Sequence, residues 1–309
     1  MRQCDVTVNP LISAAELAEY LHTVRVLDVR WRLDRPNGHA EYREGHIPGA
    51  VYVDLDTQLA AHGPATEGRH PLPSLEHVGD AARSWGLNVG DPVVIYDDFQ
   101  NVPASRAWWL LRNAGLDDVR VLDGGLAAWR ASGGPLETGD PGDPGEWDDG
   151  IVEPGNVRLT GNMDLTGRNI AGKHLPTIGL AEAADFPATG ILLDARAPER
   201  YRGEVEPMDP RAGHIPGAIN APASMNLAAD GTFLPADELR ARYESLGVVD
   251  GVPVASYCGS GVTAAQTVLA LSVAGFSSAL FPGSWSQWSN HPELPVATGP
   301  GEPGPLAAG

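Results

Sequence analysis

The sequence of 309 residues has two cysteines, Cys4 and Cys258, and no long uninterrupted apolar run. Two thiols in a chain of this length are too few for a disulfide framework or a cysteine-based metal site. A transmembrane helix is excluded as well, because it needs about 20 consecutive apolar residues. We therefore expect no metal, no cofactor and no membrane partner.

Basic residues are also scarce, since 21 Lys and Arg stand against 40 Asp and Glu and the formal net charge is −19. Nucleic-acid binding needs clustered Lys and Arg against the phosphates, and no such cluster is present, so a nucleic-acid partner is excluded. The N-terminal stretch MRQCDVTVNPLISAAEL lacks the basic start and apolar core of a secretory signal. These features predict a cytoplasmic protein.

An internal repeat organises the chain. The hexapeptide GHIPGA at residues 45–50 recurs letter for letter at residues 213–218, so the chain contains a duplication. We interpret this motif as a turn into the next strand, with its histidine bonded to a local backbone group. A motif of the active site would differ between halves that have diverged in function, whereas this motif is identical in both halves. Further paired landmarks keep the same order in both halves: VLDVR at 26–30 with LLDAR at 192–196, and VLDGGLAAW at 121–129 with LFPGSWSQW at 280–288.

Short β-branched runs alternate with longer helical patterns in each half, which is typical of β–α units around a parallel sheet. The predicted fold class is therefore α/β. Expected strands cover residues 26–29, 93–96, 119–122, 191–193, 254–257 and 279–281. Expected helices cover residues 14–21, opened by a Ser13/Glu16 capping box, and residues 104–113, 238–246 and 263–274.

A stretch dense in Gly, Pro and Asp at residues 132–145 marks an exposed connector between two domains. Two domains also fit the chain length, at roughly 100 to 200 residues per domain. We predict a first domain over residues 1–135, a connector over 136–165, a second domain over 166–298 and a disordered tail over 299–309.

The second cysteine stands in SYCGSGVTAAQ, residues 256–266, between a predicted strand and a predicted helix. In an open α/β sheet this turn lies where ligands bind, and the helix N-terminus directs free N–H groups at it. Gly259 and Gly261 let the backbone curl with its amides inward, and such donors favour a thiolate. Cys258 is therefore predicted to be a nucleophile, whereas Cys4 has no comparable context and is interpreted as incidental.

Two other interpretations of Cys258 are weaker. A buried structural cysteine needs no glycines and no helix start beside it, and the equivalent place in the first half holds Asp97 and Asp98. Phosphate chemistry on a Cys-x5-Arg loop needs an arginine at the sixth following position, where this chain has Ala264. A phosphatase is therefore disfavoured.

Taken together, the landmarks resemble those of the tandem-domain rhodanese-like sulfurtransferases. The resemblance implies two rhodanese-like domains, each a small parallel sheet flanked by helices. The first domain would be catalytically silent and the second would carry the nucleophile, in agreement with Asp97 standing opposite Cys258. The matching positions are 28–30, 45–50, 106–109, 123–125 and Trp129, then 194–196, 213–218, 258–264 and 283–285.

The residues after the cysteine separate two activities in this family. Thiosulfate sulfurtransferases carry Arg and Lys there, whereas CGSGVT at residues 258–263 resembles the loop of 3-mercaptopyruvate sulfurtransferases. The resemblance implies that Cys258 takes sulfur from 3-mercaptopyruvate as a persulfide and passes it to cyanide or to a thiol such as thioredoxin. Thiosulfate as the donor, or a non-catalytic persulfide carrier or binding module, remain alternatives.

The resemblance also implies roles for individual residues. Ser260, His70 and Asp56 match the proton relay proposed for the family. Arg200 matches one of its two substrate-binding arginines, and Arg211, in a shorter loop, is the candidate for the other. Loop residues expected to bind the substrate through the backbone are Gly259, Gly261, Val262 and Thr263.

Overall fold

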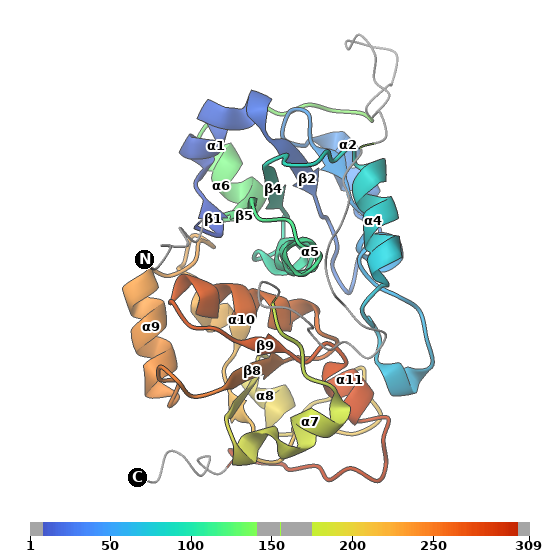
Figure 1. The fold of residues 1–309 in the computed structure, drawn as a ribbon, viewed down its shortest axis with the longest axis vertical. Coiled ribbons are helices and arrows are strands. Elements are labelled where there is room, and N and C mark those ends of the chain that lie inside the picture. Colours follow the sequence, from blue (N-terminus) through green and yellow to red (C-terminus); the bar gives the residue numbers. More distant parts are fainter. Residues whose placement is uncertain (1–8, 141–154, 156–174, 302–309) are drawn as a thin grey trace, which may run out of the picture.

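The computed structural model describes residues 9–140, 155 and 175–301. Each half of the chain forms a parallel sheet with helices on both sides, so the predicted α/β class with two rhodanese-like domains is confirmed. Figure 1 shows the two halves one above the other. No helix of the described residues is long and apolar enough to cross a membrane. Cys4, most of the predicted connector and most of the predicted tail lie outside the described residues.

The first half contains a five-stranded parallel sheet in the order β1-β5-β4-β2-β3. Its strands are β1 (Leu11–Ile12), β2 (Arg25–Asp28), β3 (Val51–Tyr52), β4 (Val93–Tyr96) and β5 (Val119–Leu122). Its helices are α1 (Ala14–Tyr20), α2 (His39–Glu44), α3 (Leu55–Gln58), α4 (Leu75–Ser84), α5 (Val102–Asn113) and α6 (Gly125–Ala131), with 3-10 turns η1 (Leu21–Thr23) and η2 (Ala65–Glu67).

The second half contains a four-stranded parallel sheet in the order β7-β6-β8-β9. Its strands are β6 (Ile191–Asp194), β7 (Ile219–Asn220), β8 (Val254–Tyr257) and β9 (Ala279–Leu280). Its helices are α7 (Leu180–Asp185), α8 (Pro198–Tyr201), α9 (Ala236–Ser245), α10 (Val262–Val273) and α11 (Ser284–Trp288), with 3-10 turns η3 (Phe186–Ala188) and η4 (Ala223–Asn226).

All six predicted strands and all four predicted helices form, with bounds that differ by at most two residues. The capping box is present, since Ser13 Oγ accepts from the Glu16 N–H and the Glu16 carboxylate accepts from the Ser13 N–H. Helix α5 begins two residues earlier than predicted because Pro103 is tolerated in the first turn. Strands β1, β3 and β7 were not predicted, because two residues are too few to show a period.

The two GHIPGA copies form the predicted turns. His46 Nδ1 lies 2.9 Å from the Tyr42 carbonyl oxygen, and His214 Nδ1 lies 2.8 Å from the Tyr201 carbonyl oxygen. Each imidazole is buried and stacks on the same tyrosine that its Nδ1 contacts. The motif therefore stabilises the entry into β3 and β7, and the interpretation of its histidine as structural is confirmed.

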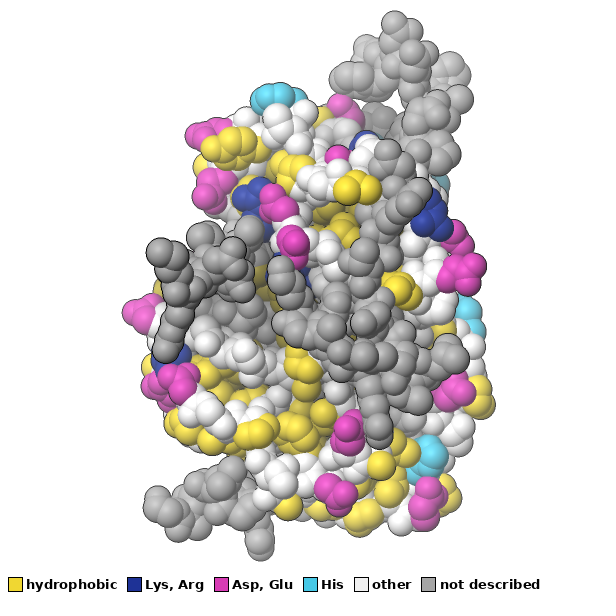
Figure 2. Space-filling view, viewed as in Figure 1, with side chains coloured by type: hydrophobic (Ala, Val, Ile, Leu, Met, Phe, Trp, Pro, Cys, Tyr) yellow, Lys and Arg dark blue, Asp and Glu magenta, His cyan; other side chains and the backbone are white. Residues whose placement is uncertain are grey.

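The two halves meet where α5 of the first packs against α10 of the second, and both helices lie at the centre of Figure 1. One continuous hydrophobic cluster runs through both halves, including Trp108 from α5 and Val268 from α10. Its burial removes apolar surface from water, so the relative position of the two sheets is stabilised. On the face shown in Figure 2, acidic side chains are spread around the rim and basic ones are few.

The two copies of the turn offer a matched stability test. Gly49 and Gly217 both have positive φ, +72° and +80°, which costs about 1 to 2 kcal/mol for any residue with a Cβ. A Cβ on Gly49 would meet nothing within 4 Å, whereas a Cβ on Gly217 would lie 2.7 Å from Pro187 Cβ. We predict that Gly217→Ala lowers the thermal midpoint more than Gly49→Ala. Equal shifts in differential scanning calorimetry would contradict the clash.

Candidate functional site

The loop between β8 and α10 holds Cys258 with its sulfur 3.1 Å from the Gly261 N–H nitrogen. The cysteine is 3% exposed. Gly261 has φ +82°, and a Cβ there would lie 2.3 Å from the Pro282 carbonyl oxygen, so this position requires glycine. The backbone therefore brings a hydrogen-bond donor, and the N-terminus of a helix of 12 residues, to the sulfur.

Helix α11 holds this loop in place. The Trp285 N–H donates to the Cys258 carbonyl at 3.0 Å, and the Ser286 N–H donates to the Gly259 carbonyl at 2.8 Å. The Cys258 N–H donates to Ser284 Oγ at 3.1 Å. With its carbonyls engaged on one side, the loop is free to direct amide groups toward the sulfur on the other.

A cavity of about 620 Å³ opens in front of Cys258. Both halves of the chain line it, because Trp31, Phe99 and Arg69 of the first half face the loop of the second. The cavity wall includes these predicted site residues: Cys258, Gly259, Ser260, Val262, Thr263 and Arg200.

The structure brings Ser260, His70 and Asp56 together across the two halves. Ser260 Oγ lies 2.8 Å from His70 Nδ1, a hydrogen-bond distance. Asp56 Oδ1 lies 3.5 Å from His70 Nε2 and accepts a hydrogen bond of 3.0 Å from Trp31 Nε1. The Trp31 ring also meets the imidazole edge-on, with ring centroids 5.3 Å apart. The imidazole is thus oriented by Ser260 on one nitrogen and by the Trp31–Asp56 pair near the other.

Burial lowers the pKa of His70 to about 4, with help from the positive charges of Arg106 and Arg69. The imidazole is therefore neutral near pH 7, and a neutral ring can both accept and donate a proton. Its contact with Ser260 Oγ links the imidazole to a hydroxyl group on the cavity wall.

Arg106 of α5 lies fully buried behind His70. It donates to the carbonyl oxygens of Leu59 at 3.3 Å, His70 at 3.1 Å and Pro71 at 3.4 Å, while its Nη1 has no hydrogen-bond partner among the residues that the structure describes. Burial lowers the pKa of Arg106 to about 10, and negative charge on Cys258 opposes that shift. The guanidinium thus fixes the segment that carries His70 and adds positive charge near the sulfur.

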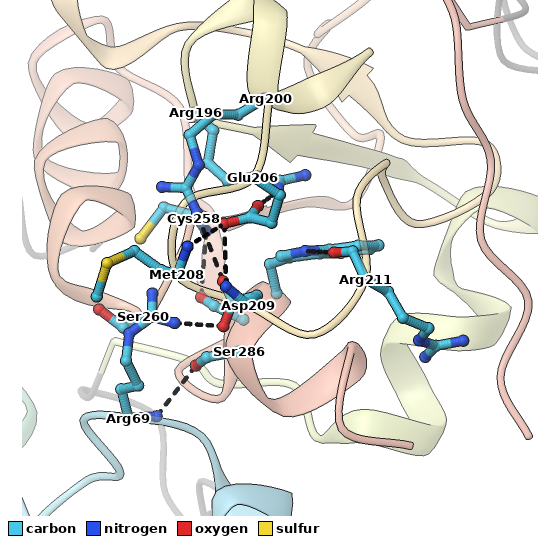
Figure 3. A network of polar contacts seen from close by, with 12 residues as sticks. Arg69, Arg196, Arg200, Glu206, Met208, Asp209, Arg211, Cys258, Ser260 and Ser286 are labelled. Atoms are coloured by element: carbon cyan, nitrogen blue, oxygen red, sulfur yellow. Dashed lines mark hydrogen bonds and ion pairs between the residues drawn. The ribbon is translucent and has the colours of Figure 1, made fainter. Parts of the chain in front are cut away.

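Arg200 lies in α8, beside the cysteine loop. Its Nη2 donates to Glu206 Oε1 at 2.7 Å and to Asp209 Oδ2 at 3.4 Å. Its Nη1 would lie 3.4 Å from a Cβ built on Gly259. The structure therefore places this predicted residue within reach of a molecule in the cavity (Figure 3).

Arg211 is not brought to the cavity, and the expectation that it is the second substrate-binding arginine is corrected. Its guanidinium donates to four backbone carbonyls at the end of α11, and in Figure 3 it points away from Cys258. Four neutral acceptors at 2.7 to 2.9 Å hold it there as a structural group. These acceptors belong to Trp288, Ser289, His291 and Leu294.

Arg69 of the first half takes the place beside the loop that was expected for Arg211. Its Nη2 would lie 3.1 Å from a Cβ on Gly259, and its Nη1 pairs with Asp209 of the second half. Sequence reasoning missed Arg69, although it directly precedes the predicted His70. The signal was weak because contacts between residues 69 and 209 depend on how the two halves pack.

The loop of the first half shows what stands in place of the cysteine. The Asp97 carboxylate accepts hydrogen bonds from the N–H groups of Phe99 at 2.8 Å, Asn101 at 3.1 Å and Ala104 at 2.9 Å. An aspartate side chain thus fills the same amide-lined turn before α5 that Cys258 fills before α10. This loop has no nucleophile of its own.

The family model described as "Rhodanese-like domain" matches residues 13–132 and 180–291. The chain therefore belongs to the rhodanese-like family, with two tandem domains.

A Mycobacterium tuberculosis protein named "Putative thiosulfate sulfurtransferase SseB" is 49% identical over 94% of this chain and 97% of its own length. "Probable 3-mercaptopyruvate sulfurtransferase" of Pseudomonas aeruginosa is 43% identical over 94% of this chain and 98% of its own. The crystal structure of SseA from Escherichia coli, titled as a 3-mercaptopyruvate sulfotransferase, has 31% identity and a TM-score of 0.74 over 90% of this chain and 99% of its own. The chain is a sulfurtransferase of the thiosulfate/3-mercaptopyruvate sulfurtransferase family.

The low pKa of His70 can be measured directly. We predict that its imidazole titrates near pH 4 by NMR, and that Arg69→Gln raises this pKa because one nearby positive charge is lost. Since the ordinary pKa is 6.5, the unfolded chain binds this proton first, and the free energy of unfolding falls as pH drops from about 6.5 to about 4. The signal is assigned by its loss in His70→Gln. Titration near 6.5 in the wild type would contradict a desolvated imidazole.

Proposed function

We propose that this chain transfers sulfur from 3-mercaptopyruvate to a thiol or cyanide acceptor through a persulfide on Cys258. The observation that carries the proposal is the 2.8 Å contact between Ser260 Oγ and His70 Nδ1, next to the cysteine loop. This contact would carry a proton to the carbon atom that keeps the electron pair when the carbon–sulfur bond of the donor breaks.

In the proposed first step the Cys258 thiolate attacks the sulfur of the donor. A sulfur–sulfur bond forms, the carbon–sulfur bond breaks, and its electron pair stays on carbon as the enolate of pyruvate. The enolate takes a proton on carbon, and the thiol proton of the donor is released from the new persulfide. No oxidant or reductant is needed, because the acceptor later removes the outer sulfur and restores the thiolate.

The proton path distinguishes the two candidate donors. With thiosulfate the leaving group is sulfite, which departs as a stable anion and needs no proton. With 3-mercaptopyruvate, protonation of the enolate contributes to the rate, and general acid catalysis typically supplies a factor of 10² to 10⁴. The loop Gly259–Thr263 also offers no Lys or Arg that would favour a dianion.

The persulfide intermediate fits the same loop. The Gly261 N–H already donates to the sulfur, and the start of α10 favours negative charge there. A cavity of about 620 Å³ exceeds what a three-carbon donor fills, which leaves room for a thiol acceptor such as that of thioredoxin.

Thiosulfate remains the second candidate donor, because the relative that is 49% identical carries thiosulfate in its name. The two donors are separated by kcat/KM, measured for each with cyanide as the common acceptor. Higher efficiency with thiosulfate would overturn the proposed donor. Sulfur transfer that survives in Cys258→Ser would overturn the mechanism.

We predict that Ser260→Ala and His70→Gln lower kcat with 3-mercaptopyruvate by about 10²-fold and change kcat with thiosulfate much less. The physical reason is that these residues serve the enolate, which thiosulfate does not form. Steady-state rates with both donors provide the measurement. The control is His46→Gln, which alters a structural histidine outside the cavity. Equal losses with both donors would show that these side chains support only the loop structure.

A non-catalytic persulfide carrier is tested separately through Arg200. A carrier does not need a substrate-binding arginine, so Arg200→Ala with unimpaired turnover would favour that alternative. A rise in KM for the donor supports an enzyme.

A further inference from the structure

Two guanidinium groups from different halves of the chain converge on one point beside the nucleophile. Arg69 Nη2 would lie 3.1 Å, and Arg200 Nη1 3.4 Å, from a Cβ built on Gly259. Gly259 directly follows Cys258, and its lack of a side chain leaves this point open. Both arginines line the cavity in front of the sulfur.

One carboxylate holds both arginines from the opposite side. Asp209 pairs through Oδ1 with Arg69 Nη1 and through Oδ2 with Arg200 Nη2 at 3.4 Å. Its side chain is 2% exposed, so both contacts are shielded from water. The Nε atoms of Arg69 and Arg200 are buried and have no hydrogen-bond partner within the part of the chain that the structure describes. The donors placed to meet a ligand in the cavity are Arg69 Nη2 and Arg200 Nη1, which lie nearest the open point at Gly259.

We propose that Arg69 and Arg200 together bind the carboxylate of the donor, and that Asp209 positions both arginines and restricts this subsite to a singly charged anion. The proposal deepens the proposed function, on which it rests for the identity of the nucleophile. Guanidinium groups suit this task because they are planar and carry several N–H donors. One edge of each group can pair with Asp209 while another edge pairs with the carboxylate of the donor.

The restriction to one charge follows from the ion pairs around the subsite. An unbroken chain of ion pairs runs from the end of β6 to the first half, and Figure 3 shows much of it. Its members alternate in charge and balance: Asp194, Arg196, Glu206, Arg200, Asp209 and Arg69. A monoanionic carboxylate adds one negative charge to this neutral chain, whereas thiosulfate adds two in a place that is mostly shielded from water.

The subsite is tested by steady-state kinetics on the full chain. Arg69→Gln should raise KM for 3-mercaptopyruvate about tenfold and leave kcat within about threefold, because the carboxylate carries the same charge in the bound donor and in the transition state. Arg69→Lys should recover part of the loss, since it keeps the charge without the planar fork. If KM for both donors stays within about twofold in Arg69→Gln, while the thermal midpoint falls, Arg69 is structural and the proposal is wrong.

The role of Asp209 is tested by donor preference. Asp209→Asn keeps the shape and removes one negative charge, so the ratio of kcat/KM for thiosulfate to that for 3-mercaptopyruvate should rise about tenfold. The control is Asp250→Asn, which makes the same charge change at an exposed pair with Arg240. An unchanged ratio in Asp209→Asn, or the same rise in the control, would overturn the charge restriction.

The two proposals fail in different ways. If the wild type prefers thiosulfate, the proposed donor is wrong, but a rise in KM for thiosulfate in Arg69→Gln still supports the two-arginine subsite. If the wild type prefers 3-mercaptopyruvate and Arg69→Gln leaves KM unchanged, the donor stands and the subsite is overturned.

Discussion

The hydrogen bond between Ser260 of one half and His70 of the other depends on how the two halves pack. Neither half contains both partners, so this hydrogen bond exists only while α5 and α10 hold the sheets together. Arg106, within α5, donates to the carbonyl of His70 itself, so the helix that makes the interface also places the imidazole. The first half therefore contributes an imidazole and two guanidinium groups to the site. This gives a physical reason for both halves to persist after the duplication.

The corresponding turns of the two halves, before α5 and before α10, are filled by different side chains. The turn before a helix in each half directs backbone N–H groups inward, and such a turn is stable when something negative or strongly accepting fills it. In the first half Asp97 fills it permanently, with three amide partners. In the second half Cys258 fills it, and the Gly261 N–H donates to its sulfur. The two turns thus share a backbone arrangement and differ in the side chain that fills it.

Structural features that repeat along the chain, or that depend on neighbouring residues, could be predicted from the sequence. Strands of four residues, the capping box at Ser13, the GHIPGA turns and the cysteine loop all express short-range patterns, and the structure shows them as predicted. Two-residue strands carry no period and were missed. The sequence could not show whether Arg69 or Arg211 reaches the cysteine loop, because both are arginines next to a motif expected in the site. The packing of the two halves brings Arg69 to the loop, and four backbone carbonyls near the end of α11 hold Arg211 away from it. Neither arrangement can be predicted from neighbouring residues in the sequence.

Two guanidinium groups lie close to the imidazole of His70 at the interface between the halves. Arg106 and Arg69 lower the pKa of His70 because they disfavour a second positive charge nearby. Burial also lowers the pKa of Arg106 itself, and its attraction to negative charge on Cys258 opposes that shift. A chain with a formal net charge of −19 thus keeps two guanidinium groups close to the imidazole at the interface of its halves.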